Sequence, residues 1–184
     1  MDSMNVYDFD KTIFRGDSTA RFFAFCLKRH PGILRRLPGI GWEAGRLVLG
    51  LTDKTKFKGR LFGFLRDIPD IDAEVAAFWA EDRDRIQPWY LKQRRPDDLI
   101  ISAGPEFLLT PVCPRLIASR VDPKTGAYTG KNCDGAEKLI RFRAAYGDAP
   151  VEAFYSDSLN DAPMAGIAAR AFLVKGDRIE PWPK

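Results

Sequence analysis

Short apolar runs alternate with segments of helical periodicity in the second half of this sequence. Residues 99–104 and 151–155 are strand-like, a shorter run follows at 171–174, and a fourth run, residues 4–9, lies near the amino terminus. Strands that are separated by helices predict parallel pairing, because a parallel connection must cross over the sheet. We therefore expect an α/β fold in which helices cover both faces of a parallel sheet.

The stretch between the first strand and the rest has a different pattern. Residues 14–86 show helical spacing and contain no strand-like run; Phe57, Leu61 and Phe64, for example, recur at i, i+4 and i+7. We expect this stretch to form a helical lobe inserted after the first strand. The chain then divides into a core, residues 1–13 and 87–184, and the inserted lobe, residues 14–86.

Local signals predict several boundaries. The turn sequence 122–126 lies between two strand-like runs and predicts a β-hairpin over residues 116–129. Asp72 is expected to cap a helix. Residues 162–169 are expected to be helical, and the proline-rich tail to be a poor element.

Positive charge is concentrated in the predicted helical lobe. The net charge of the chain is only +4, but residues 14–66 contain 12 Lys or Arg against three acidic residues, an excess of nine. A solvated basic face explains such an excess in most proteins. The alternative is attraction to an anion, which could be a phosphorylated substrate, an acidic lipid surface or nucleic acid.

The three cysteines have no metal-ligand spacing, and with one histidine in the chain a zinc site is not expected. An odd cysteine count without a disulfide pattern is typical of a reducing cytoplasm. We find neither a signal-peptide pattern nor an apolar run of the roughly 18 residues that a membrane span needs. A cytoplasmic location is the expectation, with peripheral membrane contact left open.

Polar side chains follow three of the predicted strands. Asp8 and Asp10, with Thr12 after them, end the first strand; Ser102 ends the second; Asp157 and Asp161 follow the strand at 151–155. Because sites in parallel sheets form at the carboxyl ends of strands, these residues are expected to converge. Paired carboxylates there can bind a hard cation such as Mg²⁺.

Each of these residues has an ordinary structural alternative. The aspartate pair could be an acidic turn, Ser102 a turn serine, and Asp157 and Asp161 helix caps. Lys138, at the start of the helix that precedes the strand at 151–155, could be a solvent-exposed lysine. Their appearance together and in this order favours a catalytic site.

The motifs resemble those of the haloacid dehalogenase (HAD) superfamily, in the branch of phosphoserine phosphatases with a helical cap. The motifs are DFDKT (residues 8–12), IISAG with Ser102, GAEK with Lys138, and YSDSLND (residues 155–161). The runs at 133–138 and 155–158 are also similar to those of bacterial phosphatidylglycerophosphatase C. The resemblance implies a Rossmann-like three-layer core, with residues 14–86 as the cap.

The resemblance also implies a mechanism. Asp8 would be the nucleophile that forms an aspartyl-phosphate, and Asp10 the acid and base. Mg²⁺ would be held by Asp8, the backbone carbonyl of Asp10, and Asp157, with Asp161 assisting. Phosphate would be bound by Thr12, Ser102 and Lys138. The implied activity is Mg²⁺-dependent hydrolysis of a phosphomonoester.

The substrate is less constrained than the reaction. Asp17 occupies a position where serine-specific relatives carry a substrate-reading acid, but the sequence favours the alternative that it is the N-cap of the helix before Phe22. Arg15 and the lysines at 54, 56 and 58 are possible contacts for an anionic group. A small-molecule or lipid-linked phosphate is therefore expected as substrate, and no nucleic acid. The sequence does not predict an oligomeric state.

Two other function classes stay open from the sequence. One is a binding module for anionic surfaces that uses the basic lobe and has little catalytic activity. The other is a phosphomutase, which the helical lobe disfavours because the cap of such enzymes is α/β.

Overall fold

Six strands form one sheet in the part of the chain that the computed structural model describes, residues 3–52 and 54–183. They are β1 (Met4–Tyr7), β2 (Leu99–Pro105), β3 (Leu116–Ser119), β4 (Val151–Ser156), β5 (Ala168–Lys175) and β6 (Arg178–Pro181). The order is β3-β2-β1-β4-β5-β6, with parallel pairing throughout except between β5 and β6. The predicted α/β fold with a mostly parallel sheet is confirmed.

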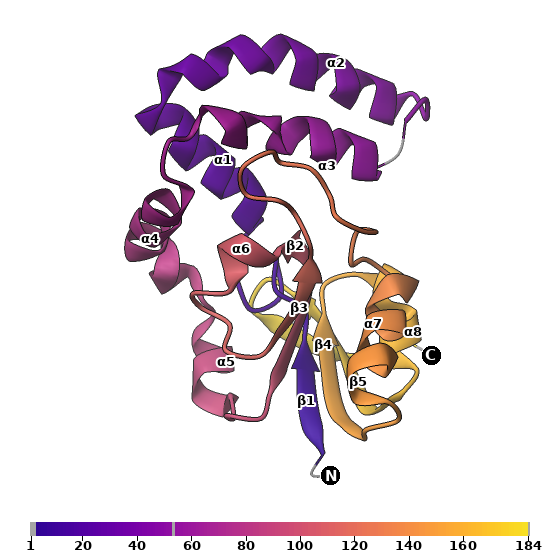
Figure 1. Ribbon diagram of the computed structural model, residues 1–184. Helices are drawn as coiled ribbons and strands as arrows, with labels where there is room; N and C mark the ends of the chain where they lie inside the picture. The colour runs from indigo at the N-terminus through magenta and orange to yellow at the C-terminus, as the bar shows by residue number, and fades with distance from the viewer. Residues whose placement is uncertain (1–2, 53, 184) are drawn as a thin grey trace.

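Helices cover the sheet and extend beyond it. The α-helices are α1 (Ser18–Arg29), α2 (Leu37–Val48), α3 (Lys54–Phe62), α4 (Ile71–Asp82), α5 (Pro88–Gln93), α6 (Glu106–Leu109), α7 (Ala136–Tyr146) and α8 (Ala162–Ala165). Short 3-10 helices are η1 (Pro31–Arg36), η2 (Gly63–Asp67), η3 (Arg83–Arg85) and η4 (Leu159–Asp161). Every element described between β1 and β2 is helical, and Figure 1 shows α1 to α4 beyond the carboxyl end of β1, with α2 outermost.

The two faces of the sheet carry separate hydrophobic clusters, as the alternation of side chains along β1 dictates. Val6 faces the cluster that includes Phe142 of α7 and Met164 of α8. Tyr7 faces the other cluster, where it stacks on Tyr155 of β4 with ring centroids 4.8 Å apart. Both faces of the sheet are therefore buried.

One of these clusters continues from the sheet into the helical lobe. Trp79 of α4 packs edge-on against Phe9 and Phe14, which follow β1, with ring centroids 6.0 Å and 5.6 Å apart. Its indole N–H donates a hydrogen bond to the carbonyl of Leu108 at 2.6 Å. The inner part of the lobe is thus joined to the sheet by shared apolar packing.

Four local predictions need correction. The cap of α4 is Asp70, which accepts a hydrogen bond from Ala73 N at 3.0 Å, and not Asp72, which lies inside the helix. The predicted hairpin over 116–129 is wrong because its first strand pairs with β2, which leaves only an isolated bridge between Val121 and Tyr128. The turn 122–126 does form.

The other two corrections lie at the carboxyl end of the chain. Helix α8 ends at Ala165, and Ala168 already belongs to β5, where it pairs with Val151 of β4. The tail, predicted to be a poor element, supplies β6, which pairs antiparallel with β5. In both cases strand pairing, which is non-local, overrides the local signal.

None of the described helices is both long and apolar enough to cross a bilayer. The three cysteines, Cys26, Cys113 and Cys133, are buried and form no disulfide.

Candidate active site

A small pocket of about 130 Å³ lies where the carboxyl ends of β1, β2 and β4 meet, which is the expected place in a parallel sheet. It is lined by Asp8, Asp10, Lys11, Asp17, Lys58, Ser102, Ala103, Asp134, Lys138, Asp157, Ser158 and Asp161. The structure therefore brings together eight of the residues that the sequence singles out: Asp8, Asp10, Asp17, Lys58, Ser102, Lys138, Asp157 and Asp161.

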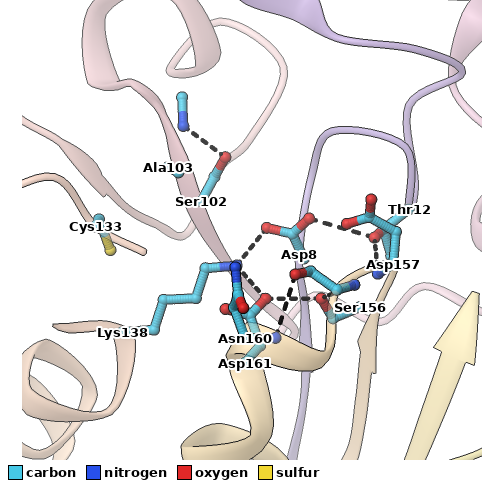
Figure 2. A network of polar contacts seen from close by, with 12 residues as sticks. Asp8, Thr12, Ser102, Ala103, Cys133, Lys138, Ser156, Asp157, Asn160 and Asp161 are labelled. Carbon is cyan, nitrogen blue, oxygen red and sulfur yellow. Dashed lines mark hydrogen bonds and ion pairs between the residues drawn. The ribbon is translucent and has the colours of Figure 1, made fainter. Parts of the chain in front are cut away.

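Asp8 lies at the centre of this pocket, one residue beyond β1, and is buried (Figure 2). Its Oδ1 accepts a hydrogen bond from Lys138 Nζ at 2.5 Å, and its Oδ2 accepts one from the Thr12 hydroxyl at 3.3 Å. Burial raises the pKa of Asp8 to about 6, although the charge of Lys138 acts in the opposite direction. The carboxylate is thus desolvated but held by a cation.

Lys138, in the first turn of α7, is 2% exposed and joins two carboxylates. Besides Asp8, its Nζ contacts Asp161 Oδ2 at 2.7 Å. Burial lowers the pKa of Lys138, but the charges of Asp8 and Asp161 outweigh it and hold the pKa above its ordinary value. The ammonium group is therefore charged, which a buried lysine without partners would not be.

Asp161 is held by two further donors. The Ser156 hydroxyl donates to Asp161 Oδ2 at 2.7 Å, and Gly135 N donates to Asp161 Oδ1 at 3.3 Å. Ser156 is fully buried and also accepts a hydrogen bond from Ser158 N at 3.1 Å. Both oxygens of Asp161 are thus engaged, and its position is set by α7 and by the end of β4.

Thr12 is fully buried and does not line the pocket, and its hydroxyl links the loops that follow β1 and β4. Its hydroxyl donates to Asp8 Oδ2 and accepts a hydrogen bond from Asp157 N at 2.9 Å. Because both functions of the hydroxyl are used within the protein, this arrangement favours a positioning role for Thr12 over direct contact with phosphate.

Asp10 and Asp17 lie on the side of the pocket toward the helical lobe. Asp10 Oδ1 accepts a hydrogen bond from Ser18 N at 2.7 Å, and Asp17 Oδ1 accepts one from Ala20 N at 2.9 Å as the N-cap of α1. Burial raises the pKa of Asp10 to about 7, and the charge of Asp17 adds to the shift. Asp17 both caps the helix and lines the pocket, so the structure is compatible with both of its predicted roles.

Ser102, in β2, is 1% exposed and lines the pocket opposite α7. Its hydroxyl accepts a hydrogen bond from Gly104 N at 3.0 Å, and within the described residues it donates none. It is thus available as a donor to a bound oxygen atom.

The helical lobe reaches the site through Lys58 of α3. Its Nζ donates to the carbonyl of Ala103 at 3.2 Å and to Asn132 Oδ1 at 3.3 Å. The Ser119 hydroxyl donates to the same two acceptors, at 3.1 Å and 3.0 Å. These contacts place a cation from the lobe at the rim of the pocket.

The other predicted contacts lie elsewhere. Arg15 is outside the pocket, where its Nε donates to Gln87 at 3.0 Å and its Nη2 forms an exposed pair with Asp177. Lys56 is exposed and does not line the pocket. The side chain of Lys54 lies outside the described part of the chain.

The charges of the pocket fit a divalent cation. Six carboxylates line it against three ammonium groups, an excess of three negative charges. In the described part of the chain, no three Asp, Glu, His or Cys side chains already converge as a metal site. However, burial raises the pKa of Asp157, and no other described residue donates a hydrogen bond to its carboxylate. A cation bound by oxygen ligands would satisfy this group.

Sequence reasoning missed some residues of the site. Ser156 lies within the motif YSDSLND, directly before Asp157, and this place in the motif was the available signal. Asn132 and Ser119 carried no local signal, because their roles depend on contacts with α3 and with the end of β2.

Comparison with protein families gives one match. A profile of the haloacid dehalogenase-like hydrolases matches residues 6–166, which is most of the chain and includes all the residues that line the pocket. A search of curated proteins found no match.

Several solved structures share the fold. A protein of unknown function from Bordetella pertussis Tohama I has a TM-score of 0.72 at 19% identity, over 92% of this chain and 88% of that one. A phosphoserine phosphohydrolase-like protein from Francisella tularensis has a TM-score of 0.54 at 18% identity, over 92% and 86%. A phosphoserine phosphatase, described as a phospho-aspartyl intermediate analogue, has a TM-score of 0.54 at 19% identity, over 92% and 84%.

Proposed function

The chain belongs to the haloacid dehalogenase-like hydrolases, and from this membership we propose that it is a Mg²⁺-dependent phosphatase that acts through an aspartyl-phosphate on Asp8. One observation carries the proposal: residues from four separate segments, among them Asp8, Ser102, Lys138 and Asp157, line one pocket at the carboxyl end of the sheet. The substrate we propose is a phosphomonoester, either small and anionic or lipid-linked.

Two aspartates divide the chemistry. A carboxylate oxygen of Asp8 attacks phosphorus, and the bond from phosphorus to the leaving oxygen breaks while Asp10 gives that oxygen a proton. Asp10, now a carboxylate, then takes a proton from the water that attacks the aspartyl-phosphate, and inorganic phosphate and free Asp8 result. Asp10 suits both steps because it lies two residues after Asp8 and lines the same pocket.

Positive charge and hydrogen-bond donors stabilise the transferring phosphoryl group. The Ser102 hydroxyl and the Lys138 ammonium group would bind its oxygens, where charge must be neutralised in the transition state. Asp161 and Ser156 would act through Lys138, since they hold it in place.

Mg²⁺ would be held by the carboxylates of Asp8 and Asp157 and by the main-chain carbonyl of Asp10. When bound, it supplies positive charge to the phosphoryl oxygens. Asp157 is favoured over Asp161 as a direct ligand because the Asp161 oxygens already accept hydrogen bonds from Lys138, Ser156 and Gly135.

Residues 14–86 are proposed as the cap that selects the leaving group. Lys58 supports this, because it extends from α3 to the rim of the pocket. A pocket of about 130 Å³ suits a phosphoryl group and little more, so the remainder of the substrate must contact the cap or displace part of it. The fold shared with the phosphoserine phosphatase described as a phospho-aspartyl intermediate analogue supports the same reaction type.

The test is hydrolysis of p-nitrophenyl phosphate by the wild-type chain and by Asp8→Asn, with Mg²⁺ and with a chelator. Turnover should need Mg²⁺ and should fall by at least about 10³-fold in Asp8→Asn, as expected when a nucleophile is removed. Asp177→Asn is the control, since Asp177 lies in an exposed pair outside the pocket. An Asp8→Asn variant with wild-type activity would exclude the mechanism.

Two further measurements separate the alternatives. Asp157→Asn should raise the Mg²⁺ concentration needed for half-maximal activity by about tenfold or more. A screen of phosphoserine, sugar phosphates and phosphatidylglycerophosphate should show release of inorganic phosphate from at least one. Transfer of phosphate between sugar positions without release would instead show a phosphomutase, and inactivity toward all of them would favour a binding module.

A further inference from the structure

Exposed apolar side chains gather on one part of the helical lobe. Five of the nine large hydrophobic residues that are exposed in the described chain lie between residues 34 and 51. The most exposed are Val48 (86%), Trp42 (73%) and Leu49 (72%). Single exposed hydrophobic residues are ordinary, but a contiguous group marks an interaction surface.

These residues form one face of α2. The residues of the helix and its C-cap that are exposed recur every three or four positions, so they share one side. We call this side the α2 apolar face; it comprises Pro38, Gly41, Trp42, Gly45, Val48 and Leu49. It contains no charged residue. Figure 1 shows α2 as the outermost helix, and the residues of the α2 apolar face are exposed.

Helix α2 is weakly supported in the free chain. It has no buried residue and no side-chain N-cap, and its interior contains Gly39, Gly41 and Gly45. Glycine in a helix interior is destabilising, and helices normally gain their stability from burying an apolar face. A surface that covers the α2 apolar face would supply that burial.

The surroundings of the α2 apolar face are basic. Residues 31–66 contain eight Lys or Arg and two acidic residues. Arg35 comes three residues before Pro38, and Arg46 directly follows Gly45. Their side chains are 71% and 43% exposed and pair with Asp67 and Glu43. An apolar helix face with Trp, Leu and Val, flanked by arginines, is the composition of helices that lie in a membrane interface.

Charge complementarity favours an anionic lipid surface over a second copy of the chain as the partner that covers the α2 apolar face. A second copy of the chain would place the face against itself, as two-fold symmetry requires, and so bring two basic segments together. An anionic lipid surface would attract the same segments. Arginine side chains can also extend to lipid phosphates while their aliphatic stems stay on the apolar face.

We propose that the α2 apolar face is a membrane-docking surface for bilayers that contain anionic phospholipids. Trp42, Val48 and Leu49 enter the boundary between headgroups and acyl chains, and Arg35 and Arg46 contact headgroup phosphates. The helix lies in the plane of the membrane and does not cross it. This surface is separate from the catalytic pocket, so docking stands or falls independently of the proposed phosphatase activity.

The experiment is co-sedimentation of the purified full chain with vesicles of phosphatidylcholine alone and of phosphatidylcholine mixed equally with phosphatidylglycerol. The wild-type chain should bind the mixed vesicles at low salt, bind the neutral ones much more weakly, and lose most binding at high salt. The Trp fluorescence should shift to shorter wavelength on binding, and Trp42→Phe should remove that shift while keeping most of the binding.

Variants test whether the α2 apolar face is the part of the protein that binds the vesicles. A triple variant, Trp42→Ser, Val48→Ser and Leu49→Ser, should bind the mixed vesicles roughly tenfold or more weakly, because interfacial binding scales with buried apolar area. Ile140→Ser is the matched control, since Ile140 is 58% exposed on α7, and it should bind like the wild type. The double variant Arg35→Gln and Arg46→Gln should reduce the preference for anionic vesicles.

Three outcomes would overturn the proposal. They are no binding of the wild-type chain to mixed vesicles at low salt, equal binding by the triple variant, and a wild-type dimer in solution that the triple variant converts to a monomer. The last outcome would assign the α2 apolar face to self-association. Circular dichroism and the urea midpoint, both expected to be close to those of the wild type in the triple variant, show that it is folded.

Discussion

Lys138, in the first turn of α7, places its Nζ 2.5 Å from Oδ1 of Asp8, which lies 130 positions earlier in the sequence. Their side chains are 2% and 9% exposed, so water screens this pair little. The same Nζ contacts Asp161, which makes one lysine the neutralising partner of two buried carboxylates. The same ion pairs therefore position the side chains of the site and stabilise the fold.

Lys138→Met should leave Asp8 and Asp161 buried without their cation. Removing one partner of a buried ion pair costs about 3–5 kcal/mol, so we expect a loss of that order in the free energy of unfolding, measured by urea denaturation. Activity should also be lost. The double variant Lys138→Met and Asp161→Asn should recover part of the stability but none of the activity; a single variant as stable as the wild type would contradict the prediction.

Ser156→Ala should disturb Asp161 and, through it, Lys138. The lost hydroxyl donates to a carboxylate, and hydrogen bonds to charged groups contribute about 1.5–3 kcal/mol. The free energy of unfolding should therefore fall by about 1.5 kcal/mol. We expect kcat to fall about tenfold with little change in KM, because the substrate does not contact Ser156. If Ser156 only stabilised the fold, the folded variant would keep the wild-type kcat.

Gly126→Ala tests how closely the turn 122–126 packs on α3. Gly126 has φ +73°, and a Cβ there would lie 2.1 Å from the carbonyl oxygen of Phe62. Gly147 also has a positive φ, +62°, but its Cβ would meet nothing within 4 Å. Gly147→Ala should therefore lower the free energy of unfolding by only about 1 kcal/mol, and Gly126→Ala should lower it by roughly 2 kcal/mol or more. Equal shifts of the two urea midpoints would show that the turn is not crowded.

Asp67 should make the stability of the helical lobe depend on acid. Hydrogen bonds from Arg36 and Arg35 hold the pKa of Asp67 at about 2. An aspartate whose pKa is lowered in the folded state stabilises the fold at pH values above its ordinary pKa of about 4. This contribution is lost as the pH falls through the folded-state pKa of about 2. Because Arg35 is 71% exposed, solvent screening reduces the effect to about 1 kcal/mol.

Asp67→Asn should accordingly be about 1 kcal/mol less stable than the wild type near neutral pH, and this difference should shrink as the pH falls through about 2. Thermal unfolding across this range measures the difference. Asp72→Asn is the control, as Asp72 is exposed in α4. A difference between Asp67→Asn and the wild type that stays constant with pH would contradict the assignment.

Much of the fold was predictable because its signals are local. The runs that became β1, β2 and β4 are short and apolar, and the polar residues that follow them indicated where a site would form. Asp17 was recognisable as a helix cap from its position before an apolar helix, and Asp17 does cap α1. In contrast, the predicted cap of α4, Asp72, was wrong, because the helix already begins at Ile71 and Asp70 is its cap.

The sequence by itself determined the residue types of the site and the order in which the strands present them. Only the tertiary structure decided that Lys138 lies between Asp8 and Asp161, that Ser156 holds Asp161, and that Arg15 lies outside the pocket. It also decided that the α2 apolar face is uncovered. The physical reason is that propensity and periodicity act over a few residues, whereas burial, ion pairing and exposure depend on segments that are far apart in the chain.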